Sequence, residues 1–524
     1  MDQFAYQLRS DVDLDRFRLR RFVERLPEDE IDTRLDAVDL ADVGRIIDGN
    51  RKAVWLQSVG PERAELVGNV IGTRSRLALA LDTSVSEVTR EVMRRLNNAP
   101  EFAHIGRDQA PVQEIVEIGE DANLLRYPVH LQHGLDGGLY ISAALDVSFD
   151  RQTGYTNTGI RRLMLRNARE TGIGLTAPSD LRAIYEQSAA RGQHLPVSFV
   201  IGSHPLDSLA SQFRIASDEL GLMASLRQSP LPLVKCITND LHVPADAEMV
   251  IEGYLDAGGH IEPEGPYGEF LGYYGIVKPN PVFRVTAITR RHDALFQTMT
   301  IAGRTMSYTD SAQLMAVRTE VTVWQALATA VREPIAVHAT SASGGMFNVR
   351  VALRQRVPGE ARNAIAAVFG CLANVKHVFV VDPDIDVYSH EEMDWALATR
   401  FQADKDFVIQ TGMRALPTDP SLEGGRVQAK AGFDCTFPFT SKRSIALTVP
   451  DYPKYDAPTF PSLEAALHDG PKSFQDLMAA RGSRDGREIV PEIDTWRTGG
   501  QVKLNQDGKW EWTGGAQISG RTES

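Results

Sequence analysis

The sequence predicts a multidomain α+β protein, with a β-rich, barrel-like middle domain between two α/β domains. Its 524 residues correspond to roughly three domains at about 150 residues each. Strand-like runs are concentrated in the middle of the chain, whereas helical and apolar patterns alternate on both sides of it. The composition, 43% hydrophobic and 24% charged, is that of a globular rather than a disordered protein.

The N-terminal domain is predicted to span residues 1–110. Short apolar runs alternate there with amphipathic stretches, which is typical of a small α/β domain. The clearest helix is expected at 85–96, where Ser84 and Glu87 have the spacing of a capping box.

The middle domain is predicted to span residues 111–310. It begins with a β-hairpin, because YISAALDVSFD alternates, RQTG is a turn and TGIRRLMLR continues on the far side. One helix is expected from about 179 to 191. Five further strand-like runs predict a barrel; they lie at 197–201, 231–236, 249–255, 282–290 and 294–301.

The third domain, at 311–480, mixes helices and strands again. Apolar helices are expected around 321–331 and 361–372, and a strand in HVFVVDPDIDVY. Residues 481–524 form a polar tail with a KWEW segment, which we expect to pack on another part of the chain or on another subunit.

Charge and cysteine content limit the partners. Lysine and arginine total 56 against 69 acidic residues, a formal charge of −13, which argues against nucleic acid because phosphate binding needs a basic surface. The three cysteines, Cys236, Cys371 and Cys435, are too far apart for a disulfide framework or a metal knuckle. No stretch of 18 apolar residues occurs, so we expect a cytoplasmic protein without a membrane span.

The densest candidate for chemistry is Glu264-Gly-Pro-Tyr-Gly-Glu269. Glycine permits sharp bends and proline fixes φ, so this loop can turn both carboxylates toward one cavity. The alternative is an ordinary acidic turn between strands, and the hexapeptide alone favours that alternative.

A second candidate is Thr156-Asn-Thr-Gly-Ile-Arg161-Arg162. A guanidinium group can clamp a carboxylate or phosphate, and the Asn157 amide oxygen can bind a cation. Glu219 and Asp180 could join Asn157 around a divalent ion. The simpler explanations are solvated arginines, a surface acid at 219, and stabilisation of Asp180 by a helix dipole.

Several familiar signatures are absent from the sequence: GxxxxGK[ST], HExxH, GxSxG and GxGxxG after a strand. Their absence argues against a P-loop enzyme, a zincin, an α/β-hydrolase and an ordinary dinucleotide dehydrogenase. A cofactor-free acid/base enzyme such as an isomerase stays open from the two glutamates alone.

Taken in order, a series of segments resembles the UbiD family of decarboxylases, which use prenylated FMN. The segments are YPVHLQHGLDGGLYISAALDVSFDRQTGYTNTGIRRLML, LPVSFVIGSHP, PLVKCITNDLHVPADAEMVIEGYLD, EGPYGEFLGYYG, ALFQTMTIAGR and VKHVFVVDPDIDVYSHEEMDWALATR. The resemblance implies a UbiD-like fold, with a central split β-barrel that binds flavin and flanking α/β domains. It also implies a linker helix to a C-terminal domain that mediates assembly.

The resemblance further assigns residues. The catalytic network falls on Arg162, Glu264 and Glu269. Metal ligands fall on Asn157, Glu219 and Asp180, and Asp180 stands where some members have histidine; the ion would be manganese or magnesium, with a potassium ion nearby. The implied cofactor-binding residues are Asn157, Ile160, Arg161, Arg162, Glu219 and Lys430.

The implied reaction is reversible, non-oxidative decarboxylation of an aromatic or heteroaromatic carboxylic acid, of a phenazine, indole, pyrrole or hydroxybenzoate type. It would proceed through a covalent adduct with prenylated FMN, with Glu269 as the proton donor. The alternatives are a 3-polyprenyl-4-hydroxybenzoate or acrylic acid decarboxylase, or a non-catalytic flavin-binding assembly protein. The implied partners are a flavin prenyltransferase that supplies the cofactor and copies of the chain itself, in a homodimer or homohexamer.

Overall fold

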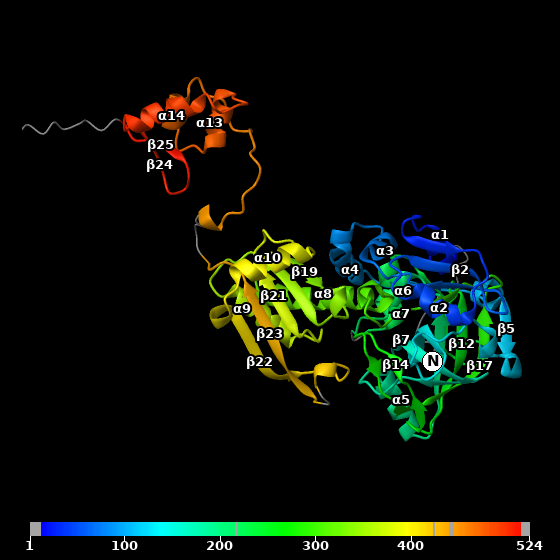
Figure 1. Cartoon of the computed structure of the whole chain (residues 1–524). Coiled ribbons are helices and arrows are strands. Elements are labelled where there is room, and N and C mark those ends of the chain that lie inside the picture. The colour runs from blue at the N-terminus through cyan, green and yellow to red at the C-terminus, as the bar shows by residue number, and fades with distance from the viewer. Residues whose placement is uncertain (1–11, 215–216, 423–424, 440–444, 515–524) are drawn as a thin grey trace, which may run out of the picture. The chain divides into compact units, whose positions relative to one another are not determined.

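The computed structural model describes residues 12–214, 217–422, 425–439 and 445–514. The chain divides into two compact units at Phe437/Pro438 (Figure 1). The predicted division at residue 480 does not coincide with this boundary, because it falls inside helix α13 (Phe474–Arg481) of the smaller unit. Residues 438–480, which were predicted to belong to the third domain, belong to the smaller unit.

A four-stranded sheet forms the N-terminal part, in the order β1-β2-β3-β18. Its strands are β1 (Ile31–Arg34), β2 (Ala53–Val59), β3 (Ala64–Gly68) and β18 (Phe296–Thr298), and its helices are α1 (Leu19–Glu24), α2 (Leu40–Ile47), α3 (Arg74–Ala80) and α4 (Val88–Leu96). The helix expected at 85–96 is confirmed, but it starts with a 3-10 turn and Ser84 makes no side-chain cap, so the capping box is absent.

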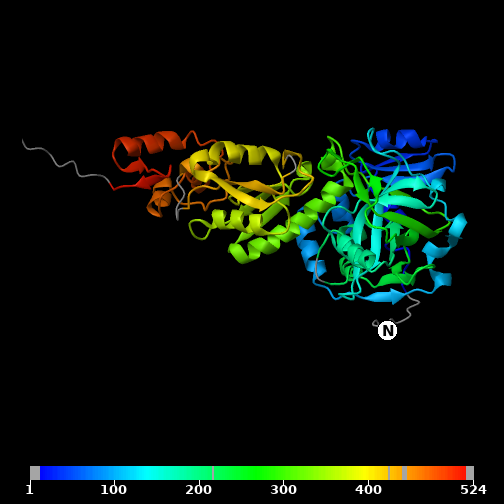
Figure 2. The same cartoon turned by 90° about the horizontal axis from the view of Figure 1, so that it is seen from below.

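The middle of the chain folds into a closed barrel of six antiparallel strands, since β12 pairs with β17 as well as with β9. The barrel strands, in order, are β12 (Met249–Leu255), β9 (Leu195–Ile201), β6 (Tyr140–Phe149), β7 (Thr156–Asn167), β8 (Glu170–Ile173) and β17 (Val282–Arg290). Figure 2 shows these strands around a common interior. Strand β5 (Ile115–Ile118) pairs with residues 287–290 of β17, whereas β8 pairs with residues 282–284 of the same strand. Helix α5 (Asp180–Ala190) packs on β7 and β9.

The prediction that all five later runs belong to the barrel is wrong for two of them. The run at 231–236 contains β10 (Leu231–Lys235), which lies in a separate sheet with β4 (Phe102–His104) and β11 (His242–Pro244). The run at 294–301 contains β18, which pairs in parallel with β3. An apolar run predicts a strand but not its partner, because pairing is decided by non-local packing. Helices α6 (Pro205–Ala210) and α7 (Glu219–Arg227) lie between β9 and β10 in the chain.

The long helix α8 (Asp310–Ala330) runs from the barrel region to the third domain, and packs against α4 and α6 as well as β19 and α9 (Figures 1 and 2). It is longer than the helix expected at 321–331. Its first half buries polar side chains such as Gln313, Arg318 and Glu320, which conceal the apolar periodicity. The buried Asp310 accepts hydrogen bonds from Ile71 N and Thr300 N, and so ties its start to two segments.

The third domain is a mixed five-stranded sheet with helices, in the order β19-β20-β21-β23-β22. Its strands are β19 (Pro334–Ala339), β20 (Asn348–Leu353), β21 (His377–Val381), β22 (Phe407–Arg414) and β23 (Val427–Cys435), and its further helices are α9 (Glu360–Gly370), α10 (His390–Arg400) and α11 (Ala403–Asp406). The expected helix at 361–372 and the strand in HVFVVDPDIDVY are therefore confirmed.

The smaller unit has a core of its own. It contains α12 (Leu463–His468), α13, α14 (Ile489–Thr498), β24 (Val502–Leu504) and β25 (Trp510–Trp512). Its buried residues include Leu467, Leu477 and Ile493, with Trp496 and Trp512 packed against them. The expected polar tail is thus largely part of a folded unit.

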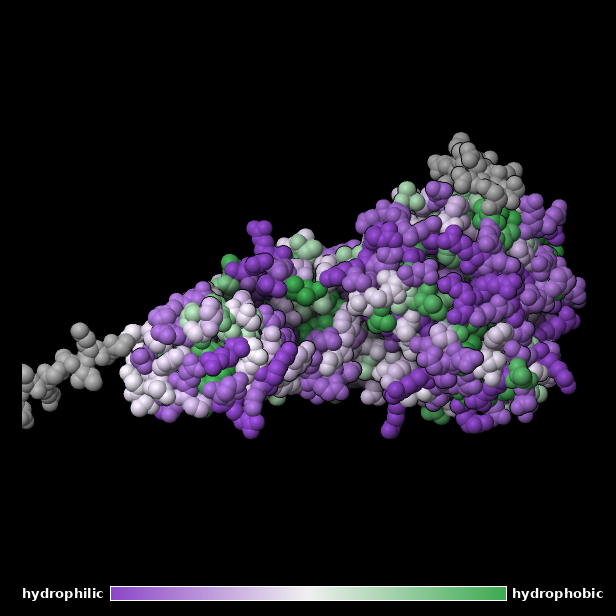
Figure 3. Space-filling model, turned by 90° about the horizontal axis from the view of Figure 1, so that it is seen from above, coloured by the Kyte–Doolittle hydropathy of each residue, from purple (hydrophilic) through white to green (hydrophobic). Residues whose placement is uncertain are grey.

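No helix among the described residues is long and apolar enough to cross a membrane. The three cysteines are free thiols. Figure 3 shows one face of the molecule, on which hydrophilic side chains predominate and hydrophobic ones form small patches.

The barrel seam, which is the pairing of β12 with β17 that closes the barrel, gives a testable prediction. Gly253 lies at a β-bulge between β12 and β17, where a Cβ would overlap the carbonyl oxygen of Arg284. Gly253→Ala should therefore lower the free energy of unfolding by about 1–3 kcal/mol, measured by urea denaturation. Gly370→Ala is the control, because nothing lies near its added methyl group; equal losses in both variants would contradict the close approach at the seam.

Candidate active site

Two nested antiparallel pairs hold the glutamates of the Gly-Pro loop. The outer pair joins β13 (Glu262–Glu264) to β16 (Lys278–Asn280), and the inner pair joins β14 (Tyr267–Gly268) to β15 (Tyr274–Gly275). Glu264 ends the outer arm, and Glu269 lies at the tip of the inner one. A Cβ at position 275 would lie 2.7 Å from Glu269 Oε1, so the glycine leaves the room that this carboxylate occupies.

Arg162 on β7 binds both carboxylates. Its Nε and Nη2 donate to Glu264 Oε1 and Oε2 at 2.8 and 3.0 Å, and its Nη1 donates to Glu269 Oε1. The Glu264 side chain is 1% exposed and that of Glu269 21%. A buried acid in a bidentate ion pair is not an ordinary acidic turn, and the two acids differ in access to solvent.

Neighbouring groups fix this network in place. Tyr140 Oη donates to Glu264 Oε1 at 3.1 Å, and Asn280 Nδ2 donates to Glu264 Oε2 at 3.3 Å. The Tyr267 ring lies 4.7 Å from the Arg162 guanidinium, within range of a cation–π contact. Burial lowers the pKa of Arg162, but the hydrogen bonds and charges of the two glutamates outweigh it and leave that pKa raised. The arginine is therefore a permanent cation here.

A second group of polar residues lies at the start of β7. Asp146 on β6 is fully buried and accepts hydrogen bonds from Asn157 Nδ2 at 2.9 Å and from Arg161 Nε at 2.8 Å. Burial raises the pKa of Asp146 to about 6. The donor side of the Asn157 amide is thereby occupied, which leaves its oxygen to bind a cation. Ile160 is half-buried, and its side chain packs against two core clusters.

Glu219 begins α7 and is 6% exposed. Its carboxylate accepts a hydrogen bond from Thr158 N and forms no ion pair within the described part of the chain. Burial raises the pKa of Glu219 to about 8; the hydrogen bond from Thr158 opposes the shift, and the charges of Asp146 and Asp180 add to it. A buried carboxylate without a cationic partner is costly, and a divalent ion would offset that cost.

The protein side chains supply only part of the coordination sphere of a metal ion. No group of three or more His, Cys, Asp or Glu side chains in the described segments is arranged to hold an ion. Asp180 is exposed at the start of α5, close enough to Glu219 for its charge to be felt. Asn157 and Glu219 therefore offer two oxygen ligands, and the remaining positions would fall to Asp180, to water or to the oxygens of a ligand.

Lys430 is not brought into hydrogen-bonding contact with the other predicted residues in the described structure. It lies on β23, and its Nζ donates to Phe369 O at 2.8 Å, at the C-terminal end of α9. A lysine at a helix C-terminus stabilises the unpaired carbonyls there, so the position has a structural role as well.

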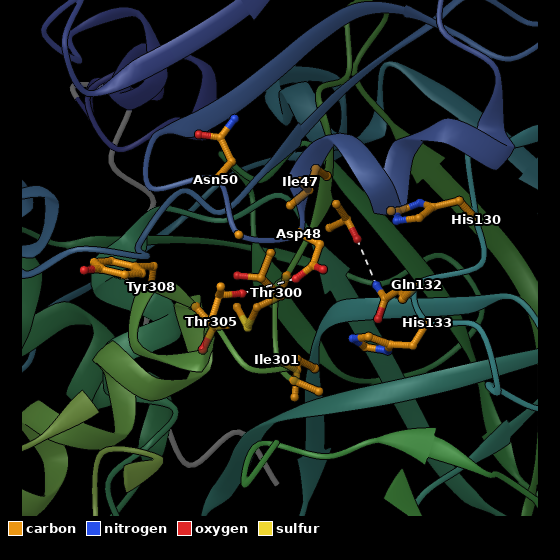
Figure 4. Close-up of a pocket in the computed structure, with 16 residues that line it drawn as sticks. Ile47, Asp48, Asn50, His130, Gln132, His133, Thr300, Ile301, Thr305 and Tyr308 are labelled. Atoms are coloured by element: carbon orange, nitrogen blue, oxygen red, sulfur yellow. Dashed lines mark hydrogen bonds between the residues drawn. The ribbon is translucent and has the colours of Figure 1, made fainter. Parts of the chain in front are cut away.

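A pocket adjoins the nested hairpins on the side of the N-terminal sheet (Figure 4). Gln132 lies in its wall and donates to Thr298 Oγ1 at 3.0 Å, and on its other side it accepts a hydrogen bond from Tyr267 Oη. Figure 4 shows Thr300 and Thr305 across the pocket from His133. The chain Gln132–Tyr267–Arg162 thus connects this pocket to the acidic network.

Sequence reasoning missed the residues that support the network, namely Tyr140, Asn280, Tyr267 and Gln132, and also Asp146 on β6. They lie on different elements, and only the fold brings them together. The alternating segment YISAALDVSFD contained one signal for Asp146. An aspartate at a position that faces the barrel interior needs a polar partner.

Comparisons with known proteins agree with the fold and with the family resemblance. Residues 103–305 match the family model for the 3-octaprenyl-4-hydroxybenzoate carboxy-lyase Rift-related domain, and residues 312–435 match the C-terminal domain of the same carboxy-lyase. The chain therefore belongs to the UbiD family, whose members are carboxy-lyases. Residues 438–524 lie outside both matches.

Individual relatives show how far the likeness extends. The anhydromevalonate phosphate decarboxylase of Aeropyrum pernix is 31% identical over 379 residues, 72% of this chain and 83% of the relative. The phenolic acid decarboxylase of Bacillus subtilis is 29% identical over 395 residues, 72% of this chain and 82% of the relative. The structure of the UbiD-class enzyme HmfF from Pelotomaculum thermopropionicum in complex with FMN has a TM-score of 0.77 and 32% identity, over 83% of this chain and 97% of that one.

The buried ion pair gives a second prediction. Arg162→Met leaves Glu264 buried without its charge partner and should lower the free energy of unfolding by about 3–5 kcal/mol, measured by urea denaturation. The double variant Arg162→Met/Glu264→Gln should recover part of that loss. Arg45→Met is the control, because Arg45 and its partner Asp42 are 75% and 47% exposed and such pairs contribute about 0–1 kcal/mol. Equal losses for Arg162→Met and Arg45→Met would contradict the role of burial.

Proposed function

We propose that the protein catalyses the reversible, non-oxidative decarboxylation of an aromatic or heteroaromatic carboxylic acid with prenylated FMN as its cofactor. The observation that carries this proposal is the Arg162 network, in which one guanidinium binds a buried and a solvent-accessible carboxylate. It suits a reaction that needs a held anion and one delivered proton. Two relatives, a phenolic acid decarboxylase and the UbiD-class enzyme HmfF in complex with FMN, support the substrate class and the cofactor.

In the proposed reaction, Arg162, Glu264 and Glu269 have different roles. Loss of carbon dioxide leaves an electron pair on the substrate carbon, and prenylated FMN, when bound, supplies the electron sink for it. Arg162 attracts and orients the substrate carboxylate. Glu264 keeps Arg162 in position from the buried side, and Glu269 transfers its proton to the carbon that carried the carboxylate. Glu269 then regains a proton from water, because part of its side chain is exposed.

The cofactor would lie along β7. Asn157 and Glu219, with Asp180, would hold a manganese or magnesium ion next to its phosphate, and a potassium ion would lie nearby. Ile160 and Arg161 would contact the flavin through their backbone, Arg162 would lie at the reactive end, and Lys430 would approach the phosphate. Glu219 supports the metal position, because it is buried and forms no ion pair within the described residues.

The proton donor can be tested directly. Glu269→Gln keeps the size of the side chain but cannot deliver a proton, so turnover should fall by a factor of about 100 or more while flavin binding is retained. Glu262→Gln removes a neighbouring exposed carboxylate and should keep the wild-type rate. The protein would be coexpressed with a flavin prenyltransferase. Release of carbon dioxide then measures turnover, and the flavin absorbance measures flavin binding. A wild-type rate in Glu269→Gln would refute the assignment.

The metal position predicts a pH dependence. Glu219 must lose its proton to bind a cation, and burial raises its pKa to about 8. Below that pH the apparent affinity for Mn²⁺ should rise about tenfold per pH unit, and it should level off above it. Glu219→Gln should abolish this binding in calorimetric titrations of the flavin-free protein, whereas Glu120→Gln, an exposed control, should not. Unchanged Mn²⁺ affinity in Glu219→Gln would remove Glu219 from the site.

A second substrate class has support in the relatives, several of which are named anhydromevalonate phosphate decarboxylases. A panel that contains aromatic acids, acrylic acids and phosphorylated aliphatic acids, assayed for carbon dioxide release, separates the classes. We further propose that the chain forms a homodimer or homohexamer and receives its cofactor from a flavin prenyltransferase.

A further inference from the structure

A short segment that precedes β6 is bound to the tip of the inner hairpin, which is the β14–β15 pair. Its Asp136 side chain is fully buried. Asp136 Oδ2 accepts a hydrogen bond from His133 N at 2.9 Å and lies 3.2 Å from His133 Nδ1, whereas Oδ1 accepts a hydrogen bond from Gly268 N at 3.1 Å. Gly268 immediately precedes Glu269 in the chain. One carboxylate therefore joins its own turn to the backbone next to the proposed proton donor.

The same segment is bound to both arms of the inner hairpin. Leu135 N donates to Tyr274 Oη at 3.0 Å, and Tyr274 belongs to β15. Gly137 N donates to Pro266 O at 2.8 Å, directly before β14. These contacts come from consecutive residues, so the hairpin is held at several points by one short stretch of chain. We call the residues that make these contacts the clamp: His133, Leu135, Asp136 and Gly137.

The clamp lies in direct contact with the backbone of the hairpin. A Cβ at Gly137 would overlap Gly265 O, and a Cβ at Gly268 would lie 2.6 Å from His133 Nδ1. The His133 ring also lies edge-on to the Tyr267 ring, with the centroids 5.9 Å apart, in the range of an aromatic pair. Glycine at both positions lets the two segments approach this closely.

The tip of the inner hairpin is a tight turn that begins at Glu269. Glu269 N donates to Tyr273 O at 2.8 Å, and Gly272 N donates to Glu269 O at 2.9 Å. The Glu269 side chain is 21% exposed, so the backbone has to fix the place from which it reaches the substrate. A proton donor must lie within hydrogen-bonding reach of the atom that it protonates, and a displacement of about 1 Å can cost a factor of about 100 in rate.

We propose that Asp136 is a positioning residue for the proton donor, because it fixes the place of Glu269 through Gly268 N. This inference rests on the proposed decarboxylase function and gives the clamp a part in it. Glu264 holds Arg162 by two hydrogen bonds of its own. Loss of the clamp therefore displaces the proton donor and leaves the group that binds the substrate carboxylate in place.

Two variants loosen the clamp in different ways. Asp136→Asn keeps the size of the side chain, but one amide oxygen cannot accept from donors on both sides. Gly137→Ala pushes the segment away from Gly265 O. In protein coexpressed with a flavin prenyltransferase, each variant should lower kcat for carbon dioxide release by about tenfold or more, with KM and flavin content within about twofold of wild type. Gly134→Ala is the control in the same segment, because nothing lies near its added methyl group.

The solvent deuterium isotope effect on kcat separates positioning from a general loss of folded protein. A displaced donor slows the proton transfer itself, so the isotope effect should rise in Asp136→Asn and in Gly137→Ala and should keep its wild-type value in Gly134→Ala. Partial unfolding would lower kcat without changing the isotope effect.

Amide hydrogen exchange of the flavin-free full chain measures the contact without turnover. The Gly268 N–H should lose protection in Asp136→Asn, because its acceptor is weakened, and should keep it in Gly134→Ala. Unchanged protection in Asp136→Asn would contradict the hydrogen bond on which the inference depends.

The outcomes separate the inference from the proposed function. Equal losses of kcat in Gly137→Ala and Gly134→Ala, or an unchanged isotope effect in both clamp variants, would overturn the inference alone. Wild-type turnover in Asp136→Asn and in Gly137→Ala would do the same. A wild-type protein that releases no carbon dioxide from any acid of the panel would refute the proposed function, and the inference would fail with it.

Discussion

The bidentate ion pair between Arg162 and Glu264 is the constraint on which the site depends. A charge that is removed from water must find its opposite in a fixed place, so β7 of the barrel and the nested hairpins at 262–280 have to hold a single relative position. Tyr140 and Asn280 satisfy the rest of the Glu264 carboxylate. Because this buried half is rigid, the other half, Glu269, has a defined place at the edge of solvent.

Two regions along β7 differ in their charge balance. Arg162 is a cation bound by two acids, whereas near the start of the strand the buried Glu219 of α7 accepts a hydrogen bond from Thr158 N and forms no ion pair within the described residues. An uncompensated buried charge is costly in the free chain. The divalent ion proposed for this position would offset that cost, and it would give a chain of net charge −13 a local positive charge for an anionic ligand.

Much of the fold was predictable from the sequence, and the failures have a common cause. The hairpin of β6 and β7 follows from alternation across a turn, and α5 from its proline and first-turn aspartate, because these signals are local. The runs at 231–236 and 294–301 are strands as predicted, but their partners are β4 and β3 rather than barrel strands. The first half of α8 was not predicted as a helix, because buried polar residues such as Glu320 resemble a solvated face in the sequence. Glu320 in fact pairs with Arg74.

The sequence by itself determined which residue types were available: two glutamates around a Gly-Pro bend, an arginine five positions after an asparagine, and the ordered segments that resemble the UbiD family. It could not decide whether Glu264 was a surface turn or a buried acid, because burial depends on what packs against the loop. Only the tertiary structure placed Arg162 between Glu264 and Glu269, and brought Tyr140 and Asn280 to the Glu264 carboxylate. Electrostatic interactions depend on distance in space, and distance in space is what the order of residues leaves open.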